Sequence, residues 1–178
     1  MAKRKLLKDQ VRRKLFDILL DEDSLIRHYS LSPAVCLEIE LRRRDHNRLG
    51  FAIQLCLMRY PGRVLGAGET PPRAMIRYVA DQIGADPEAF VFYARREESR
   101  RDHTARLIVY LNTRSPTAQD RRAALLAAIQ AAMMSDEGAA IASSIVATFR
   151  ERESLLPAID TIERIGLAPL LVGEQREC

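Results

Sequence analysis

Apolar residues recur along this chain three or four positions apart, at the spacing of helices, and no convincing alternation of apolar and polar residues is present. The first apolar stripe consists of Leu7, Val11, Leu15, Ile18 and Leu19. It predicts an amphipathic helix over residues 6–20. The acidic residues at 21–23 suit the first turn of a second helix that ends at Tyr29, because helix N-termini favour negative charge. The pattern therefore predicts an all-α protein.

A serine followed by a proline predicts the start of a third helix, because Ser32 can cap free amide groups and Pro33 fits a first helical turn. We expect this helix to reach about Arg44. The next helix, over residues 45–60, is apolar on nearly every side, which predicts that it forms the buried centre of the first domain. Its apolar residues are Leu49, Phe51, Ala52, Ile53, Leu55, Cys56, Leu57 and Met58.

Further helices are predicted in the second half of the chain, beginning with a long charged helix over residues 93–111. Thr117 and Asp120 have the spacing of a capping box, with Asp in the place of the usual Glu. The helix that they open carries one apolar face, made of Leu125, Leu126, Ile129 and Met133. The helix after it is marked by Ile141, Ile145, Val146 and Phe149.

The clearest break in the helical pattern lies between residues 61 and 72, where prolines and glycines interrupt it. We predict two small helical domains, helix-turn-helix-like bundles, joined by this Pro/Gly-rich linker. The expected boundaries are 1–64 for a basic N-terminal domain, 65–73 for the linker, 74–168 for the second helical domain and 169–178 for a divergent tail.

The positive charge of the chain is concentrated near its N-terminus. Residues 1–63 hold 14 Lys and Arg against 8 Asp and Glu, a net charge of +6, whereas the whole chain carries +4. Such an asymmetry is typical of a protein with one half that binds a polyanion and another that supports it. The alternative interpretation is a basic surface that is merely solvated.

Little in the sequence points to catalysis or to a bound metal. Cys36, Cys56 and Cys178 are too widely spaced for a disulfide framework or a zinc motif. The paired acids Glu97 and Glu98 lie in a run of alternating charge, which is typical of a solvated helix face. We expect no catalytic residue, no metal site and no cofactor. Because neither a signal peptide nor an apolar membrane span is evident, we expect a cytoplasmic protein.

A basic cluster lies where the third predicted helix gives way to the buried one, with the sequence Arg42-Arg43-Arg44-Asp45-His46-Asn47-Arg48. Arginine presents a fixed fork of donors to phosphate oxygens and guanine edges, and Asn47 can pair with adenine. Alternatively, the arginines complement a helix C-terminus and Asn47 caps the buried helix. That helix is too apolar to lie in a major groove, so any base contact must come from its first turn or from another helix.

Other basic residues extend this cluster. Lys3, Arg4 and Lys5 form an N-terminal arm of a kind that can follow the DNA backbone or enter a minor groove. The complete set of predicted DNA-binding residues is Lys3, Arg4, Lys5, Arg42, Arg43, Arg44, Asn47, Arg48, Arg59, Arg63, Arg95 and Arg96.

Four stretches of the sequence carry a resemblance to a known family: residues 21–29, 42–63, 93–98 and 161–165. They resemble transposases of the Tn-three class, the replicative transposases of bacterial mobile elements. The resemblance extends over roughly residues 3–168, and the block at 42–63 is long and uninterrupted.

This resemblance implies a helical N-terminal region with DNA-binding modules that recognise the terminal inverted repeats of an element. It also implies a catalytic domain far downstream, which uses three acidic residues and divalent metal, so no catalytic acid is carried over to this chain. Because members of the family are much longer, we expect a truncated transposase or an isolated N-terminal part of one.

We therefore predict the non-catalytic, DNA-binding part of a transposase, which recognises terminal inverted repeats in DNA transposition. The expected partner is the double-stranded DNA of transposon ends, self-association is left open, and no membrane is involved. The alternative is a helical interaction or regulatory fragment, or an inert remnant of a truncated transposase. The intact basic blocks favour the first hypothesis, and the tail after residue 168, which departs from the family's pattern, favours the second.

Overall fold

The computed structural model describes residue 12, residues 15–95 and residues 97–174. The described chain is helical, and within it the only strand-like feature is an isolated bridge between Arg114 and Ser154. The predicted all-α class is therefore confirmed. No helix among these residues is long and apolar enough to cross a membrane.

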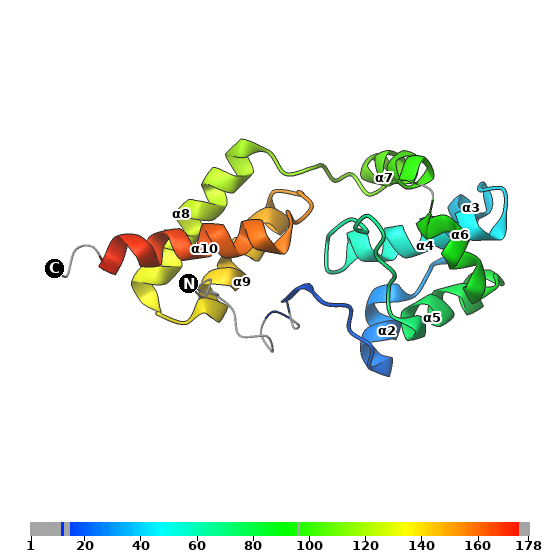
Figure 1. Ribbon diagram of the computed structural model, residues 1–178, viewed down its shortest axis with the longest axis horizontal. Helices are drawn as coiled ribbons and strands as arrows, with labels where there is room; N and C mark the ends of the chain where they lie inside the picture. Colours follow the sequence, from blue (N-terminus) through cyan, green and yellow to red (C-terminus); the bar gives the residue numbers. More distant parts are fainter. Residues whose placement is uncertain (1–11, 13–14, 96, 175–178) are drawn as a thin grey trace. The chain divides into compact units, whose positions relative to one another are not determined.

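The chain divides into two compact units. One, here called the α2–α7 unit, spans residues 18–112. The other, here called the α8–α10 unit, contains described residues up to Asp17 together with those from Thr113 onward. The helices of both units are labelled in Figure 1.

The α2–α7 unit is built around one helix. Its elements are α2 (Glu22–Tyr29), α3 (Pro33–Glu40), α4 (Asp45–Arg59), α5 (Arg73–Ile83), the 3-10 turn η1 (Pro87–Ala89), α6 (Phe90–Ala94) and α7 (Glu97–Tyr110). Every residue of α4 from Leu49 to Met58 is buried, and the other elements of the unit pack on it. Figure 1 shows α4, in cyan, among α3, α5, α6 and α7. The prediction that this helix forms a buried centre is confirmed.

The approach of α6 to α4 depends on a glycine. A Cβ atom at Gly50 would lie 2.2 Å from the ring of Tyr93, so no other residue fits this position of α4 without a shift of α6. Gln54, about one turn further along α4, is fully buried but satisfied, because its side-chain amide donates to the Tyr93 hydroxyl (2.7 Å) and to the carbonyl of Arg100 (3.0 Å). The hydroxyl of Thr104 donates to the Gln54 carbonyl oxygen at 3.0 Å.

The predicted linker lies inside the α2–α7 unit instead of between two domains. Within it, Arg63 donates to both carboxylate oxygens of Glu69 at 2.9 and 2.6 Å, and Arg100 of α7 donates to the carbonyl of Gly66 at 2.7 Å. Because α5, α6 and α7 all pack on α4, the chain remains in one unit past the loop and leaves it only at Asn112. The observed division thus differs from the expected boundary at residues 65–73.

The α8–α10 unit consists of α8 (Ala118–Met134), α9 (Gly138–Glu151) and α10 (Ile159–Glu174), which pack on one another. The predicted capping box is present: the Thr117 hydroxyl accepts from the amide of Asp120, and the Asp120 carboxylate accepts from the amide of Thr117. The same carboxylate accepts from Arg114 and from Arg152, at 2.7 and 2.6 Å. It thereby fastens the start of α8 to the segment that follows α9.

The core of this unit confirms one predicted apolar face and corrects another. Ile141, Ile145, Val146 and Phe149 of α9 are buried, as their spacing predicts. On α8 the buried residues include Ala124 and Ala128, whereas the exposed ones include Leu126, Ile129 and Met133. The small side chains of alanine let α8 approach its neighbours closely, and the large residues lie on the outer face. The predicted apolar face of Leu125, Leu126, Ile129 and Met133 therefore does not form the core: Leu125 is half-buried and the other three are exposed.

The helix predicted over residues 6–20 falls mostly outside the described residues. Its described end is helical at Leu15 and Phe16 but not from Asp17 to Leu20, so the helix does not reach position 20. Phe16 is buried in the core of the α8–α10 unit. The third helix likewise stops at Glu40, before the predicted end at Arg44.

Candidate nucleic-acid interface

The basic cluster occupies the short turn between α3 and α4, and its first arginine points inward. The guanidinium of Arg42 lies 3.8 Å from the centre of the Phe51 ring and donates to the carbonyl and the carboxylate of Glu38, both at 3.0 Å. The Arg42 side chain is only 9% exposed. It therefore fastens the turn to α4 and presents little of its charge to solvent.

Arg43 and Arg44 are exposed. Arg44 is the N-cap of α4, and its carbonyl accepts from the amides of Asn47 and Arg48 at 3.1 and 3.0 Å. Its backbone has φ 88° and ψ 137°, a conformation that side chains with a Cβ rarely adopt. Such a position ordinarily favours glycine, and a residue held there costs about 1–3 kcal/mol. The arginine at this position therefore lowers the free energy of unfolding.

Arg48 and Asn47 lie on the first turn of α4. Arg48 donates to the carbonyl of Ile83 at 2.9 Å and lies 3.5 Å from the carboxylate of Asp45, so it joins the start of α4 to the end of α5. The α4 N-terminus has no side-chain cap, which excludes a capping role for Asn47. The side-chain amide oxygen Oδ1 of Asn47 is buried and makes no hydrogen bond with the described residues.

Helix α7 adds an arginine that the sequence pattern did not single out. Arg106, with a side chain 63% exposed, lies on one wall of a cleft of about 310 Å³ opposite the α3–α4 turn. The cleft is lined by Glu38, Leu41, Arg42, Arg43, Asn47, Asp102, His103 and Arg106. Glu38 pairs with Arg42 and Asp102 with Arg106 (3.2 Å), which leaves the charge of Arg43 unneutralised by the acids of this cleft. Because Arg106 is far from Arg43 in sequence, only the packing of α7 on α4 could reveal that both arginines line one cleft.

His103 forms the inner wall of this cleft. Its Nδ1 lies 3.1 Å from the Tyr93 hydroxyl, its ring stacks on that of Tyr93, and the Phe51 ring packs nearly perpendicular to it. Burial, and secondarily the nearby positive charge of Arg42, lower the pKa of His103 to about 4. The imidazole is therefore neutral at physiological pH and contributes no positive charge to the cleft.

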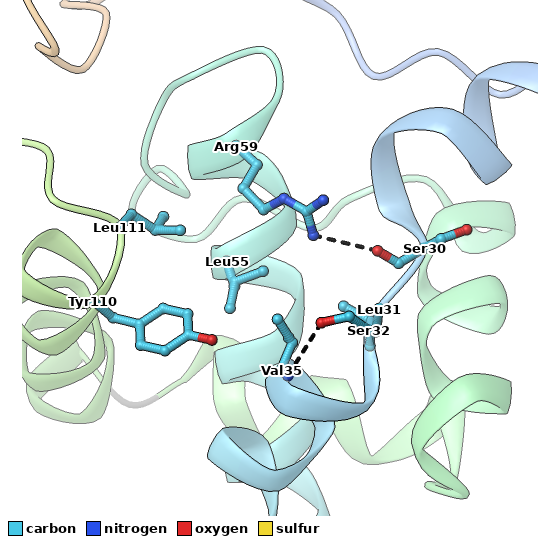
Figure 2. A pocket seen from close by; sticks show the side chains of 8 residues that line it. All are labelled: Ser30, Leu31, Ser32, Val35, Leu55, Arg59, Tyr110 and Leu111. Carbon is cyan, nitrogen blue, oxygen red and sulfur yellow. Dashed lines mark hydrogen bonds between the residues drawn. The ribbon is translucent and has the colours of Figure 1, made fainter.

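Arg59 lies at the other end of α4, in a separate cleft of about 380 Å³ that is shown in Figure 2. It donates to the carbonyl of Ser30 at 3.2 Å, while Val35, Leu55 and Tyr110 form the wall drawn below it. The guanidinium of Arg59 remains exposed beside this apolar wall. Arg59 and the α3–α4 turn thus belong to different clefts of the same unit.

The remaining predicted site residues do not join either cleft. Arg63 is engaged with Glu69, and Arg95 is exposed at the end of α6. Lys3, Arg4, Lys5 and Arg96 lie outside the described residues. The structure therefore brings together Arg42, Arg43, Asn47 and the unpredicted Arg106, with Arg44 and Arg48 next to them in the chain.

A family model described as "Domain of unknown function (DUF4158)" matches residues 6–168, which is nearly the whole chain. The chain belongs to this family. The DUF4158 region here is 35% identical over 176 residues to the transposase for transposon Tn21 of Escherichia coli, an alignment that covers 99% of this chain and 18% of that protein.

Two further relatives are also transposases. The DUF4158 chain is 35% identical over 164 residues to the transposase for transposon Tn501 of Pseudomonas aeruginosa, covering 92% of this chain and 17% of the relative. It is 30% identical over 173 residues to the transposase for transposon Tn1546 of Enterococcus faecium, covering 97% and 18%. These similarities confirm the predicted resemblance to Tn-three-class transposases. The chain spans less than a fifth of the length of these relatives.

Proposed function

We propose that this chain binds double-stranded DNA and recognises the terminal inverted repeats of a mobile element, with the α3–α4 turn as its main phosphate-binding surface. The similarity to transposases over nearly the whole chain supports a role in transposition. The single observation that carries the choice of surface is Arg44, which holds a backbone conformation suited to glycine and yet presents an exposed guanidinium.

The proposed surface assigns different tasks to the arginines. Arg43, Arg44 and Arg106 contact phosphates, because their guanidinium groups are exposed and lie on or beside the two walls of one cleft. Arg42 and Arg48 hold the turn, since their donors are already directed to Glu38 and to Ile83. Arg59 supplies a separate contact at the far end of α4, and the arm at Lys3, Arg4 and Lys5 adds charge.

We propose in addition that the chain does not cut or join DNA strands. The resemblance seen in the sequence assigns the catalytic acids of Tn-three-class transposases to a part far downstream of the region that this chain matches. Incubation of the purified protein with labelled repeat DNA and magnesium or manganese should leave the strands intact. Nicking that follows the protein through purification, and that is lost in an unfolded variant, would contradict this.

The test of DNA recognition is selection from a pool of random-sequence duplexes, followed by affinity measurement on the enriched sequence and on a scrambled one. We expect one sequence class to be enriched and to bind at least about a thousandfold more tightly than scrambled DNA, the low end of the usual range for specific binding. A pool that remains unenriched, together with equal weak binding to both duplexes, would contradict the proposal.

A second candidate function is a helical interaction module, and one observation favours it. The outer face of α8 exposes Leu126, Ile129 and Met133, at 58%, 39% and 81% of their surface, in a row at helical spacing. If this face supplied the main function, Leu126→Asp would abolish the biological activity and leave DNA binding unchanged. Arg43→Ala would weaken DNA binding and leave the biological activity unchanged.

A further inference from the structure

Helix α3 carries an apolar stripe on its exposed face. Ala34, Leu37 and the C-cap residue Leu41 recur three and four residues apart, and Leu37 and Leu41 are 65% and 70% exposed. Ile39, on the opposite side of the helix, is fully buried, and α3 packs on α4. Single exposed leucines are common on protein surfaces, but a row of them along one helix face indicates a binding surface.

Positive charge follows directly after this stripe. Arg43 and Arg44 are exposed at the end of α3, and Arg106 lies across the cleft that contains Leu41. Among the exposed residues of α3 itself, Glu40 is the charged one. The surface is therefore an apolar ridge that contains one carboxylate and has cations at one end. The cations complement a groove whose edges are lined with phosphates.

We propose that the exposed face of α3, defined by Ala34, Leu37 and Leu41, packs against the C5-methyl groups of thymines in the major groove of bound DNA. The proposal rests on the proposed function, and it names the helix and the bases involved. The thymine methyl is the apolar group that a base pair presents in the major groove. When the arginines at the end of the ridge bind phosphates, the leucines of the ridge can therefore contact this methyl group.

The neighbouring helix cannot take this role. Helix α4 is buried from Leu49 to Met58, so it cannot lie in a groove, whereas α3 exposes one continuous face. Its eight residues extend about 12 Å, and the major groove, about 12 Å wide, admits a helix. Glu40, on the same face, can accept a hydrogen bond from the amino group of a cytosine. The structure thus assigns to α3 a preference for sites with thymine methyl groups at contact distance.

The test compares the enriched duplex with a copy in which deoxyuridine replaces every thymidine, a change that removes only methyl groups. We expect wild-type protein to bind the uracil duplex about fourfold more weakly for each methyl that it contacts, and about fifteenfold for two, from the transfer free energy of a buried methylene. The L37A/L41A variant should bind the thymine duplex more weakly and should not distinguish it from the uracil duplex.

The matched control is L126A, because Leu126 is a leucine of similar exposure on the outer face of α8. It should keep the full wild-type difference between the thymine and uracil duplexes. Tyrosine near-ultraviolet circular dichroism checks that L37A/L41A is folded, and it should be unchanged because both leucines are exposed. Far-ultraviolet circular dichroism on heating checks L126A, because Leu126 lies in the unit without tyrosines.

Three results would overturn the inference: an enriched sequence without thymine, equal wild-type affinity for the two duplexes, or an unchanged thymine preference in L37A/L41A. Each of these leaves specific DNA binding intact and so removes only the assignment of α3. Failure to enrich any sequence, in contrast, contradicts the proposed function itself. If L37A/L41A loses binding to a protein partner while its affinity for DNA is unchanged, the ridge is a protein-docking face and the inference is wrong.

Discussion

The two units of this protein are both helical, but α4 and α8 differ in the size of the residues that they bury. In the α2–α7 unit, α4 buries large residues such as Leu49, Phe51 and Ile53 on all sides. In the α8–α10 unit, α8 turns Ala124 and Ala128 inward and leaves Leu126 exposed. An apolar pattern that surrounds a helix predicts burial well, whereas on an alanine-rich helix the large residues need not face the core.

The units also differ in how they satisfy buried polar groups. The α2–α7 unit holds a network of neutral groups, in which Gln54, Tyr93 and His103 bond one another around α4. The α8–α10 unit instead buries the carboxylate of Asp120 against two partly exposed arginines. The hydrogen bonds from Arg114, first, and from Thr117 hold the pKa of Asp120 well below its usual range. The two units should therefore respond differently to substitution and to pH.

Spectroscopy can separate these responses. All five tyrosines, at positions 29, 60, 78, 93 and 110, lie in the α2–α7 unit, and the chain has no tryptophan. Near-ultraviolet circular dichroism from tyrosine therefore reports on the α2–α7 unit, while far-ultraviolet circular dichroism reports on the helices of both.

The largest expected effect comes from a charge at the centre of α4. Ile53→Asp should abolish the tyrosine signal, because an unpaired buried carboxylate costs several kcal/mol, about the whole stability of a small unit. Leu126→Asp, on the outer face of α8, should change the free energy of unfolding by only about 0.5 kcal/mol. Chemical denaturation of both variants measures this contrast. Equal destabilisation by the two substitutions would show that the α8 face is buried and the comparison mistaken.

The next effect concerns the anchor of the α8–α10 unit. Asp120→Ala removes an N-cap partner and charge-assisted hydrogen bonds from Arg114 and Arg152, and should cost about 3–5 kcal/mol. Far-ultraviolet circular dichroism should show an earlier loss of helix on heating, while the tyrosine signal keeps its wild-type transition. Loss of the tyrosine signal at the same lower temperature would show that the two units unfold together.

The pH dependence of the α2–α7 unit should follow His103. Its pKa is about 4 when folded and about 6.5 when unfolded, so the unfolded state binds more protons between these values. Stability should therefore fall by about 3 kcal/mol as the pH drops from about 6.5 to about 4. Asp120, with a lowered pKa, weakens the other unit only below about pH 4. Denaturation followed by the tyrosine signal from pH 4 to 7 measures this; a His103→Gln variant with the same slope would exclude His103 as the cause.

A smaller effect, of opposite sign, is expected at the α3–α4 turn. Arg44→Gly relieves a backbone conformation that favours glycine, which is worth about 1–3 kcal/mol. Because glycine loses about 1 kcal/mol more chain entropy on folding, the net stabilisation of the unit should be about 1 kcal/mol. The same substitution should weaken DNA binding, because a phosphate contact is lost. A thermal melt and a DNA-binding curve on one preparation measure the change in stability and the change in affinity. A variant that is less stable, or that binds DNA as tightly as wild type, would contradict a functional reason for Arg44.

Much of this fold could be predicted from local signals, and the failures have physical causes. Ser32, Thr117 and Asp120 predict helix starts because capping is a local interaction. The Pro/Gly loop at 61–72 looks like a linker, but contacts with Arg100, far away in the sequence, hold it within one unit. The apolar face predicted on α8 does not show which side is buried, because helical spacing does not say whether alanine or leucine faces the core.

In the candidate site, too, local signals were predicted and tertiary contacts were not. Arg43 and Arg44 are visible in the sequence as part of a basic run, yet the run alone cannot show that Arg42 turns inward onto Phe51. Arg106 was missed because it is a single basic residue after the run of alternating charge on α7, and only tertiary packing places it at the same cleft as the turn. Basic clusters therefore predict the region of a site, while burial and pairing decide which of their members are available to a ligand.

The most direct test of the proposed interface is the salt dependence of DNA affinity in an Arg43→Ala/Arg44→Ala variant. If wild type neutralises about six phosphates, the plot of log affinity against log salt has a slope near about −5. The double variant should bind all sequences more weakly and flatten that slope by about 1–2 units. Arg121→Ala/Arg122→Ala, which removes an adjacent exposed pair from α8, should leave the slope at its wild-type value. An unchanged slope and affinity in the Arg43/Arg44 variant would exclude the α3–α4 turn from the DNA-binding surface.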